Sequence, residues 1–272
     1  MPVHHAATPG LPPIASPGGE GPATDHTTAD ASTSARLVGV HTGAVRTLQS
    51  PRVPGAAPTR WRSAILKAPR SDAVAAGALG LDGDAQHDRR HHGGPTKAVL
   101  CYAAAHYDAW APLAAEHLAA QGDIVAAMLG AHDFGPGAFG ENLLLDGVDE
   151  HDVCIGDLWQ VGTCVLRITE PRGPCGTLAR RWAWPALVTH VRRTARAGWY
   201  CAVETPGIVQ RGDEAVLRTR VAPAWTIARV FHLVESRVSS AEALRALAES
   251  PAAHEGLRDR CLRRLATPGR TR

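Results

Sequence analysis

Short apolar stretches separated by turn residues dominate the chain from residue 36 to about residue 222. They predict strands at Leu37–Val40, Trp61–Lys67, Trp199–Val203 and Ala215–Val221. A hairpin is predicted where Asp157–Val161 and Cys164–Thr169 flank Gly162 and Thr163, because a two-residue connection with glycine first is typical of a tight turn. We therefore expect this part of the chain to be rich in β-structure.

Apolar residues at helical spacing predict helices in two places within that part. Tyr102–Ala120 is rich in alanine, and Pro112 is expected to split it into two pieces. A second helix is expected to begin at Pro185 and to be closed by Gly198, with Leu187 on its apolar face.

After Pro223 the pattern becomes wholly helical. Three short helices are predicted, at Trp225–Ser236, Ala241–Ala248 and His254–Leu265. Ser240 and Ser250 supply start signals for the second and third of them. We therefore place a domain boundary near Ala222, with a β-rich domain at 36–222 and a three-helix unit at 223–272.

Residues 1–35 differ in composition from the rest of the chain. They include six prolines, four glycines and three acids, but no lysine or arginine. Such a stretch buries too little apolar surface to offset its ordering entropy, so a disordered tail is predicted. Without it, 29 cationic residues face 23 acidic ones, which gives the remaining chain a net charge of +6.

The composition of the 272-residue chain also excludes several classes of protein. Apolar residues make up 44% of it, which is enough to bury a core and excludes a wholly disordered protein. The basic residues form no stripe or arm, so no nucleic-acid partner is expected. No apolar run reaches the roughly 18 residues of a membrane span, and no signal-peptide pattern opens the sequence. We expect a cytoplasmic protein without a membrane partner.

Six cysteines are scattered without any CxxC pair, which indicates free thiols and no zinc ribbon or iron-sulfur cluster. Cys175 differs from the others because it lies in a turn rich in proline and glycine, three residues after Arg172. A nearby guanidinium favours a thiolate, which could act as a nucleophile, a persulfide carrier or a soft metal ligand. The alternative is an inert buried thiol, the interpretation that we give to the other five cysteines.

The segment Gly83–Lys97 is the most informative candidate site. Paired glycines let backbone N–H groups approach an anion, and Lys97 adds a positive charge, so this segment could cradle a phosphate. A second interpretation is a zinc or iron site, and a third is a polar loop with solvated histidines. The ligands of such a metal site would be Asp84, His87, His91 and His92.

Two further residues carry open alternatives. Asn142 offers a donor and an acceptor, which could bind a heterocyclic ring or clamp a loop. Glu141 could be a base or a surface acid. The chain has only two lysines, Lys67 and Lys97, and both lie near the candidate residues.

Together these residues resemble a known family, the MOSC domain (molybdenum cofactor sulfurase carboxy-terminal domain), in its YiiM-like branch. The resemblance runs from about Leu37 to the end, and the last 45 or so residues are similar to the three-helix domain appended in that branch. The segments that carry it are Trp61–Lys67, Gly83–Asp84, His92–Val99, Tyr102, Phe139–Leu143, Pro171–Cys175 and Gly198–Tyr200.

The resemblance implies an α+β fold, with a β-rich, barrel-like domain and peripheral helices, that holds the molybdenum cofactor. By motif position, Cys175 would ligate molybdenum, for which a thiolate is a suitable donor, and would be the catalytic residue. The pterin and its phosphate would be held by Ser63, Lys67, Asp84, His92, Gly93, Gly94, Lys97, Asn142 and Arg172. Gly176 and Thr177 stand where many relatives have a larger residue and then lysine, which leaves the substrate preference open.

Two functions follow from the resemblance. In the first, the protein is a molybdenum-dependent oxidoreductase that reduces N-hydroxylated compounds to amines. In the second, it is a non-catalytic carrier of the cofactor or of persulfide sulfur on Cys175. The enzyme would need a separate electron-donor protein, a reductase with a flavodoxin- or ferredoxin-like carrier, because the chain shows no dinucleotide fingerprint and no iron-sulfur spacing.

Overall fold

The structure is a computed structural model that describes residues 34–49, 59–88, 93–121, 134–236 and 238–267. The described residues belong to one compact unit. Nearly all of the predicted tail, residues 1–33, lies outside the described residues. Within the described part, no helix combines the length and the apolarity needed to cross a membrane.

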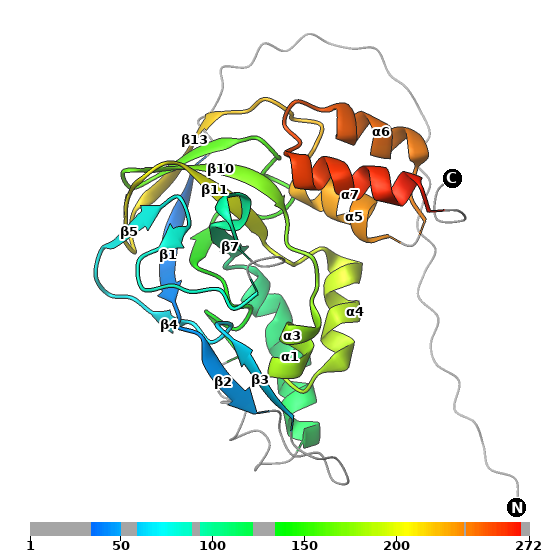
Figure 1. Cartoon of the computed structure of the whole chain (residues 1–272). Helices are drawn as coiled ribbons and strands as arrows, with labels where there is room; N and C mark the ends of the chain where they lie inside the picture. The colour runs from blue at the N-terminus through cyan, green and yellow to red at the C-terminus, as the bar shows by residue number, and fades with distance from the viewer. Residues whose placement is uncertain (1–33, 50–58, 89–92, 122–133, 237, 268–272) are drawn as a thin grey trace, which may run out of the picture. The chain divides into compact units, whose positions relative to one another are not determined.

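Seven strands close into a barrel, which confirms the predicted β-rich α+β fold (Figure 1). Around the barrel, the order is β1 (Ser34–Thr42), β13 (Glu214–Thr219), β9 (Leu158–Val161), β10 (Cys164–Pro171), β11 (Trp199–Thr205), β7 (Val99–Ala103) and β8 (Leu143–Asp146). The barrel is closed because β8 pairs with β1. Every pair is antiparallel except β7 with β8. Parallel neighbours need a long crossover, and the chain between these two strands contains the helix α1 (His106–Gln121).

The hairpin predicted around Gly162 and Thr163 is confirmed. Cys164 pairs with Val161, and Gly162 has a positive φ of 56°. A Cβ atom at Gly162 would lie 2.4 Å from the carbonyl oxygen of Ile208, so glycine is needed here for space as well as for backbone conformation.

Short strands outside the barrel form two small sheets and extend β1. The pair β2 (Arg46–Gln49) and β3 (Arg60–Ser63) forms a separate hairpin, and β4 (Ala68–Pro69) adds to β1. A small sheet consists of β12 (Gly207–Val209), β5 (Val74–Gly77) and β6 (Gly80–Leu81).

The strand predicted at Trp61–Lys67 ends early, at Ser63. The Ser63 hydroxyl accepts a hydrogen bond from the Ile65 amide at 3.1 Å, a local bond that competes with strand pairing. Ala64 and Ile65 are both buried, so the chain turns inward here instead of continuing along the hairpin.

Two details of the helix prediction around Pro112 were wrong. Tyr102 belongs to β7, and α1 continues through Pro112. Pro112 is exposed, whereas Trp110 and Ala114 on either side of it are buried. We infer that the burial of these side chains outweighs the backbone hydrogen bond that proline removes.

The segment after β10 contains two helices, α3 (Gly176–Arg181) and α4 (Pro185–Thr194), of which the sequence pattern predicted only the second. Helix α4 begins at Pro185 as expected. It ends before Gly198, because Ala195 adopts the left-handed conformation (φ 56°) and closes the helix there.

The three C-terminal helices lie where they were predicted. They are α5 (Ile227–Glu235), α6 (Ala241–Glu249) and α7 (Glu255–Leu265). Thr226 and Ser240 cap the first two, each accepting a hydrogen bond from a backbone amide three residues later. One apolar cluster joins barrel residues such as Ile168 to Val230 and Leu257 of these helices. The core is therefore continuous across Ala222, and a separately folding unit at 223–272 stays a prediction.

A second apolar cluster covers the outside of the barrel beneath α1, α3 and α4. It includes Tyr102, Trp110, Phe139, Trp182 and Leu187, all of them buried. Because Phe139 and Ile65 of this cluster also line a pocket, the cluster fixes the floor of the candidate site described next.

Candidate active site

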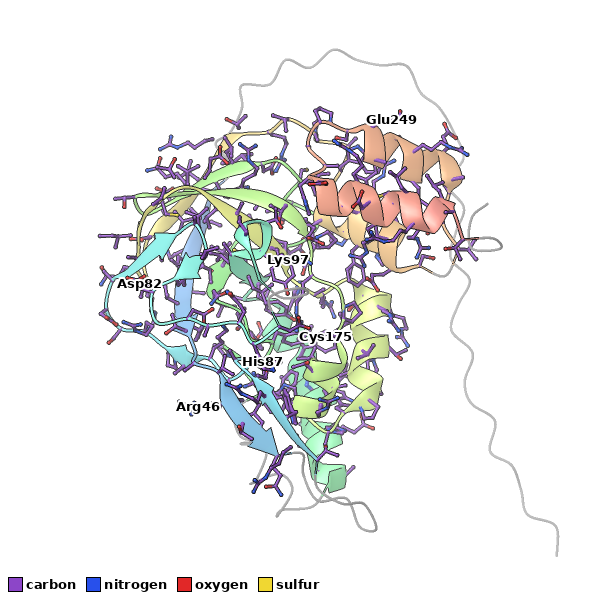
Figure 2. The ribbon with its side chains drawn as sticks, viewed as in Figure 1. Arg46, Asp82, His87, Lys97, Cys175 and Glu249 are labelled. Atoms are coloured by element: carbon purple, nitrogen blue, oxygen red, sulfur yellow. The ribbon has the colours of Figure 1, made fainter. Side chains whose placement is uncertain are left out.

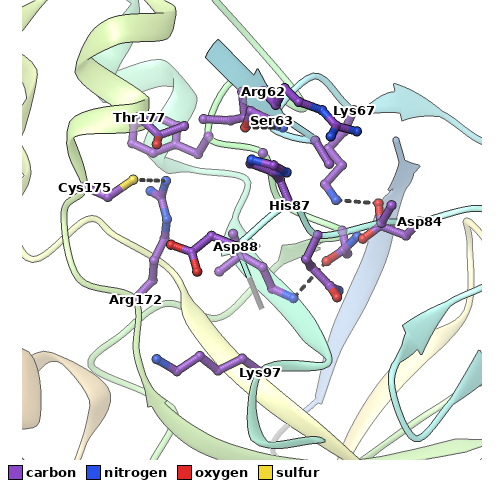
Figure 3. A pocket seen from close by; sticks show the side chains of 18 of the residues that line it. Arg62, Ser63, Lys67, Asp84, His87, Asp88, Lys97, Arg172, Cys175 and Thr177 are labelled. Carbon is purple, nitrogen blue, oxygen red and sulfur yellow. Dashed lines mark hydrogen bonds and ion pairs between the residues drawn. The ribbon is translucent and has the colours of Figure 1, made fainter. Parts of the chain in front are cut away.

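A pocket of about 240 Å³ opens between the β2–β3 hairpin, the segment after β6 and the start of α3. Figure 2 labels three residues that line it, His87, Lys97 and Cys175, and Figure 3 shows it from close by. The structure brings seven of the predicted site residues together in this lining: Ser63, Lys67, Asp84, Lys97, Asn142, Arg172 and Cys175.

Cys175 is the only partly exposed cysteine among the six, and it directly precedes α3. The Arg172 guanidinium is directed at it, with Nη2 4.0 Å from the sulfur (Figure 3). Arg172 is only 3% exposed, its guanidinium lies over the Phe139 ring, and its Nη1 atom has no hydrogen-bond partner within the described residues. The site thus holds a buried cation with an unsatisfied donor beside an accessible thiol.

The other five cysteines are buried, as predicted. Burial raises the pKa of the thiols of Cys154, Cys164, Cys201 and Cys261, and for Cys164 it reaches about 11. A thiol with a raised pKa is mostly protonated at neutral pH and is a poor nucleophile or metal ligand.

Lys67 and Asp84 form an ion pair inside the pocket wall (Figure 3). Their side chains are only 7% and 1% exposed. Asp84 Oδ1 also accepts a hydrogen bond from the Gly43 amide at 2.8 Å, whereas its Oδ2 atom is buried without a partner among the described residues. Burial lowers the pKa of Lys67, and the attraction of Asp84 opposes that shift.

Lys97 lies at the end of the short 3-10 helix η1 (Pro95–Lys97). Its ammonium is 3.4 Å from Glu170 Oε1 and lies over the Tyr200 ring. Tyr200 lines the pocket, and burial raises its pKa to about 12, so its hydroxyl stays protonated at neutral pH. Lys97 therefore contributes a positive charge to the wall while it is held by a carboxylate.

Asn142 clamps the backbone, which is one of the two roles considered for it. Its Oδ1 accepts from the Leu100 amide at 3.1 Å, and its Nδ2 donates to the His41 carbonyl at 3.2 Å. The same side chain also lines the pocket. Asn142 thus joins β1 and β7 directly behind the site.

Glu141 was expected to be a base or a surface acid, and its complete burial shows that it is not a surface acid. It is fully buried and accepts hydrogen bonds from the Tyr107 hydroxyl at 2.6 Å and from the amides of Gly137 and Phe139. This carboxylate holds the turn that carries Phe139 and Asn142 into the pocket floor.

Arg181, at the end of α3, does not line the pocket but supports its floor, a role that sequence reasoning missed. Its Nη1 donates to the carbonyl oxygens of Ile65, Gly137 and Ala138, at 3.1, 2.7 and 2.9 Å. Burial lowers its pKa to about 10, so it is still charged at neutral pH. The side chain ties α3, which begins beside Cys175, to both loops of the pocket floor. No local spacing signals this role, because its three partners are distant backbone groups.

The glycine-rich segment contributes less to the pocket than expected. Gly93 and Gly94 do not line it, although Gly94, with φ 88°, shapes the turn into η1. His92 and His91 lie outside the described residues. His87 lines the pocket, but the described residues contain no group of three or more His, Cys, Asp or Glu side chains placed to hold a metal ion.

The side chains present fit the cofactor that the sequence resemblance implies. Arg172 offers a buried donor without a partner, which suits an anionic group. Cys175 offers a soft, accessible sulfur in the same pocket, which suits molybdenum. Lys67, Lys97 and Arg62 add positive charge to the lining, against Asp84 and Asp88.

Comparisons with known proteins place the chain among MOSC domain proteins. A family model for the MOSC domain matches residues 88–216, and MOSC domains are associated with binding of the molybdenum cofactor. The chain is 35% identical over 176 residues to a protein named "Reductase" from Gibberella moniliformis, a match that covers 64% of this chain but only 29% of that protein. It is 30% identical over 172 residues to the protein YiiM of Escherichia coli, with 60% of this chain and 71% of YiiM covered.

The fold has solved relatives as well. The crystal structure of YiiM from Geobacillus stearothermophilus matches with a TM-score of 0.63 and 27% identity, covering 85% of this chain and 99% of that one. From the pocket and from these similarities in sequence and structure, we conclude that the chain belongs to the MOSC domain family and is YiiM-like.

Proposed function

We propose that the protein binds the molybdenum cofactor in this pocket and reduces N-hydroxylated compounds to amines. The observation that carries the proposal is the position of Cys175, the one accessible thiol, beside the buried and partly unsatisfied guanidinium of Arg172. A relative named "Reductase" supports an oxidoreductase rather than a passive binding protein.

In this proposal, Cys175 ligates molybdenum, and Arg172 and Lys97 face the anionic parts of the cofactor. Ser63, Lys67, Asp84 and Asn142 supply the polar wall around it. The predicted contributions of Gly93, Gly94 and His92 stay predictions, because the glycines lie off the described lining and His92 is outside the described residues. When bound, the cofactor would supply a centre that carries two electrons and accepts the oxygen of an N–OH group.

The chain's own residues contribute binding, orientation and exclusion of water. The apolar part of the pocket wall includes Leu100, Phe139 and Ile65, which are buried and limit the access of water to the floor. Trp61, with the Arg180 guanidinium over its ring, and Thr177 line the pocket as well. The overall reaction consumes two electrons and two protons for each N–OH group and yields an amine and water.

The electrons are proposed to come from a separate acidic carrier protein. Arg46, Arg60 and Arg62 are exposed on the β2–β3 hairpin, and Arg180 is exposed on α3. These four arginines outnumber Asp82 and Asp88, the exposed acids in the described part of the loop after β6. Such a basic surface beside the pocket would attract a negatively charged flavodoxin- or ferredoxin-like partner, and the attraction should weaken with salt.

Metal analysis combined with turnover tests the function. The protein is purified without oxygen from a host that makes the cofactor, and a hydroxylamine-type substrate is supplied with a chemical reductant. Molybdenum near one atom per chain together with amine formation supports the enzyme. Cofactor-free protein that carries a persulfide on Cys175 would support the sulfur carrier instead.

The proposed docking of the electron carrier on the basic surface is tested separately with the Arg60→Glu variant. Arg60 is chosen because it does not line the pocket. We expect it to raise the carrier concentration needed for half-maximal rate and to leave turnover with the chemical reductant unchanged. Arg193→Glu reverses another exposed charge, on α4, and serves as the control. Equal effects of the two variants, or carrier-driven rates that ignore salt, would remove the docking proposal.

A further inference from the structure

A buried carboxylate connects the pocket wall to the C-terminal helices. Glu170 lies near the end of β10, and its side chain is only 7% exposed. On the pocket side, its Oε1 is 3.4 Å from Lys97 Nζ. On the other side, the same oxygen is 3.2 Å from His254 Nε2, and its Oε2 is 3.9 Å from Arg260 Nη1. His254 caps the start of α7, and Arg260 lies within that helix.

The same helices contact the loop that carries Arg172 and Cys175. Arg260 also pairs with Glu235 of α5, and Glu235 lies 3.7 Å from Arg192 of α4. A Cβ atom added at Gly173, between Arg172 and Cys175, would lie 3.2 Å from Glu235 Oε1 and 3.8 Å from Arg260 Nη2. The Glu235–Arg260 pair therefore packs against the loop Arg172–Cys175 at Gly173. A larger side chain at Gly173 would crowd this ion pair.

The groups around Glu170 determine whether its carboxyl group is charged. Burial by itself raises the pKa of Glu170, but the nearby His254 imidazole and the charges of Lys97 and Arg260 outweigh burial and lower it. Glu170 is thus an anion shared between one cation of the pocket wall and two groups of α7. Without His254 and Arg260, the negative charge of Glu170 would be balanced by Lys97 and would cancel more of the positive charge of the pocket wall.

We propose that Glu235, His254 and Arg260 are positioning residues, through which the C-terminal helices hold the Cys175 loop and keep the adjacent pocket wall positively charged. The helices then complete the site of the barrel. For the reaction, this inference rests on the function proposed for Cys175. The arrangement itself concerns only this chain's residues and can be tested without the cofactor.

The test measures the local electrostatic potential at Cys175 in the full-length chain, purified from a host that cannot make the cofactor. Iodoacetate is anionic and iodoacetamide is neutral, but both are attacked by the same thiolate, which forms a carbon–sulfur bond and releases iodide. Both rates at Cys175 are followed by peptide mass spectrometry. The iodoacetate rate divided by the iodoacetamide rate does not depend on the thiolate fraction, so this ratio reports the local electrostatic potential. The other five cysteines are buried, so the signal is specific.

Removing a positive and a negative charge of the network should change this ratio in opposite directions. Arg260→Gln should lower it about twofold or more, whereas Glu170→Gln should raise it by a similar factor. Arg260→Lys keeps the charge and should restore most of the ratio. Arg263→Gln removes a charge from the same helix at a side chain that is 72% exposed, and should leave the ratio near that of the wild type.

Melting temperatures of all variants show which of them are folded. An unchanged ratio in folded Arg260→Gln protein would overturn the proposal, and so would an equal decrease in Arg263→Gln. If Arg260→Gln does not fold, Glu170→Gln decides, since an unchanged or lowered ratio in that near-isosteric variant contradicts the proposed charge balance. Failure of reductive turnover in loaded protein would affect the proposed function and leave this ratio untouched.

Discussion

Replacing Glu141 by glutamine tests whether this buried carboxylate is a scaffold of the pocket floor or a base within it. The side chain is fully buried and accepts three hydrogen bonds, from the Tyr107 hydroxyl and from the amides of Gly137 and Phe139. Glutamine has nearly the same shape but only one acceptor oxygen. At least one of the three donors must therefore face an NH2 group.

The magnitude follows from this hydrogen-bond count. A buried donor left without an acceptor costs about 1–3 kcal/mol, and each of the two remaining bonds loses about 1 kcal/mol when its acceptor becomes neutral. Removing a buried charge offsets part of this cost, so we expect a net destabilisation of about 3 kcal/mol. For a chain of this size, that corresponds to a decrease of about 6–12 °C in melting temperature.

Thermal and urea unfolding measure this effect, with Glu116→Gln on the exposed face of α1 as the matched control. The control should stay within about 0.5 kcal/mol of the wild type. A Glu141→Gln protein with the wild-type melting temperature would refute the scaffold role. If that protein also lost turnover with its cofactor content intact, Glu141 would have to act in the chemistry.

Three further predictions concern the pocket and its wall. Cys175→Ser should abolish turnover and keep the fold, because a hydroxyl is a poor substitute for thiolate on molybdenum, and serine variants of the five buried cysteines should retain activity in the same assay. Lys67→Ala should destabilise the protein by about 3–5 kcal/mol in urea unfolding, because it leaves the Asp84 carboxylate buried without its ion pair, and the double variant with Asp84→Ala should recover part of this loss. The folded pKa of Glu170 lies below its ordinary value of 4.5, so its stabilisation is present above pH 4.5 and is lost as pH falls through the folded pKa. Unfolding free energies of Glu170→Gln should accordingly depend less on pH below about 4.5 than those of the wild type, and parallel curves would contradict this.

Local patterns were sufficient for elements that are stabilised locally. The β9–β10 hairpin follows from Gly162 and Thr163 between two apolar strands, and the C-terminal helices follow from periodicity, with Ser240 capping α6 as predicted. The start signal predicted at Ser250 was wrong, because Ser250 ends α6 and His254 caps α7. Predictions failed where tertiary contacts decide the outcome. Helix α1 continues through Pro112 because Trp110 is buried beside it. Strand β3 ends early because the chain turns inward to bury Ile65.

The candidate site shows the same division. Motif resemblance selected seven residues that the structure brings into one pocket, including Cys175 and Arg172. It could not show that Asn142 bonds to two backbone groups or that Arg181 donates to three carbonyls, because those partners are distant in sequence. The contacts of Glu170 with α7 were hidden for the same reason, since neither His254 nor Arg260 belongs to a local motif.

The most direct test of the central claim is the molybdenum content of wild-type and Cys175→Ser protein, purified side by side without oxygen, together with reduction of an N-hydroxylated substrate by a chemical reductant. The account predicts about one molybdenum per wild-type chain with amine formation, and no turnover in the Cys175→Ser protein. Wild-type turnover in the Cys175→Ser protein with molybdenum bound, or a wild-type protein that is fully loaded but cannot reduce any N–OH substrate, would contradict it.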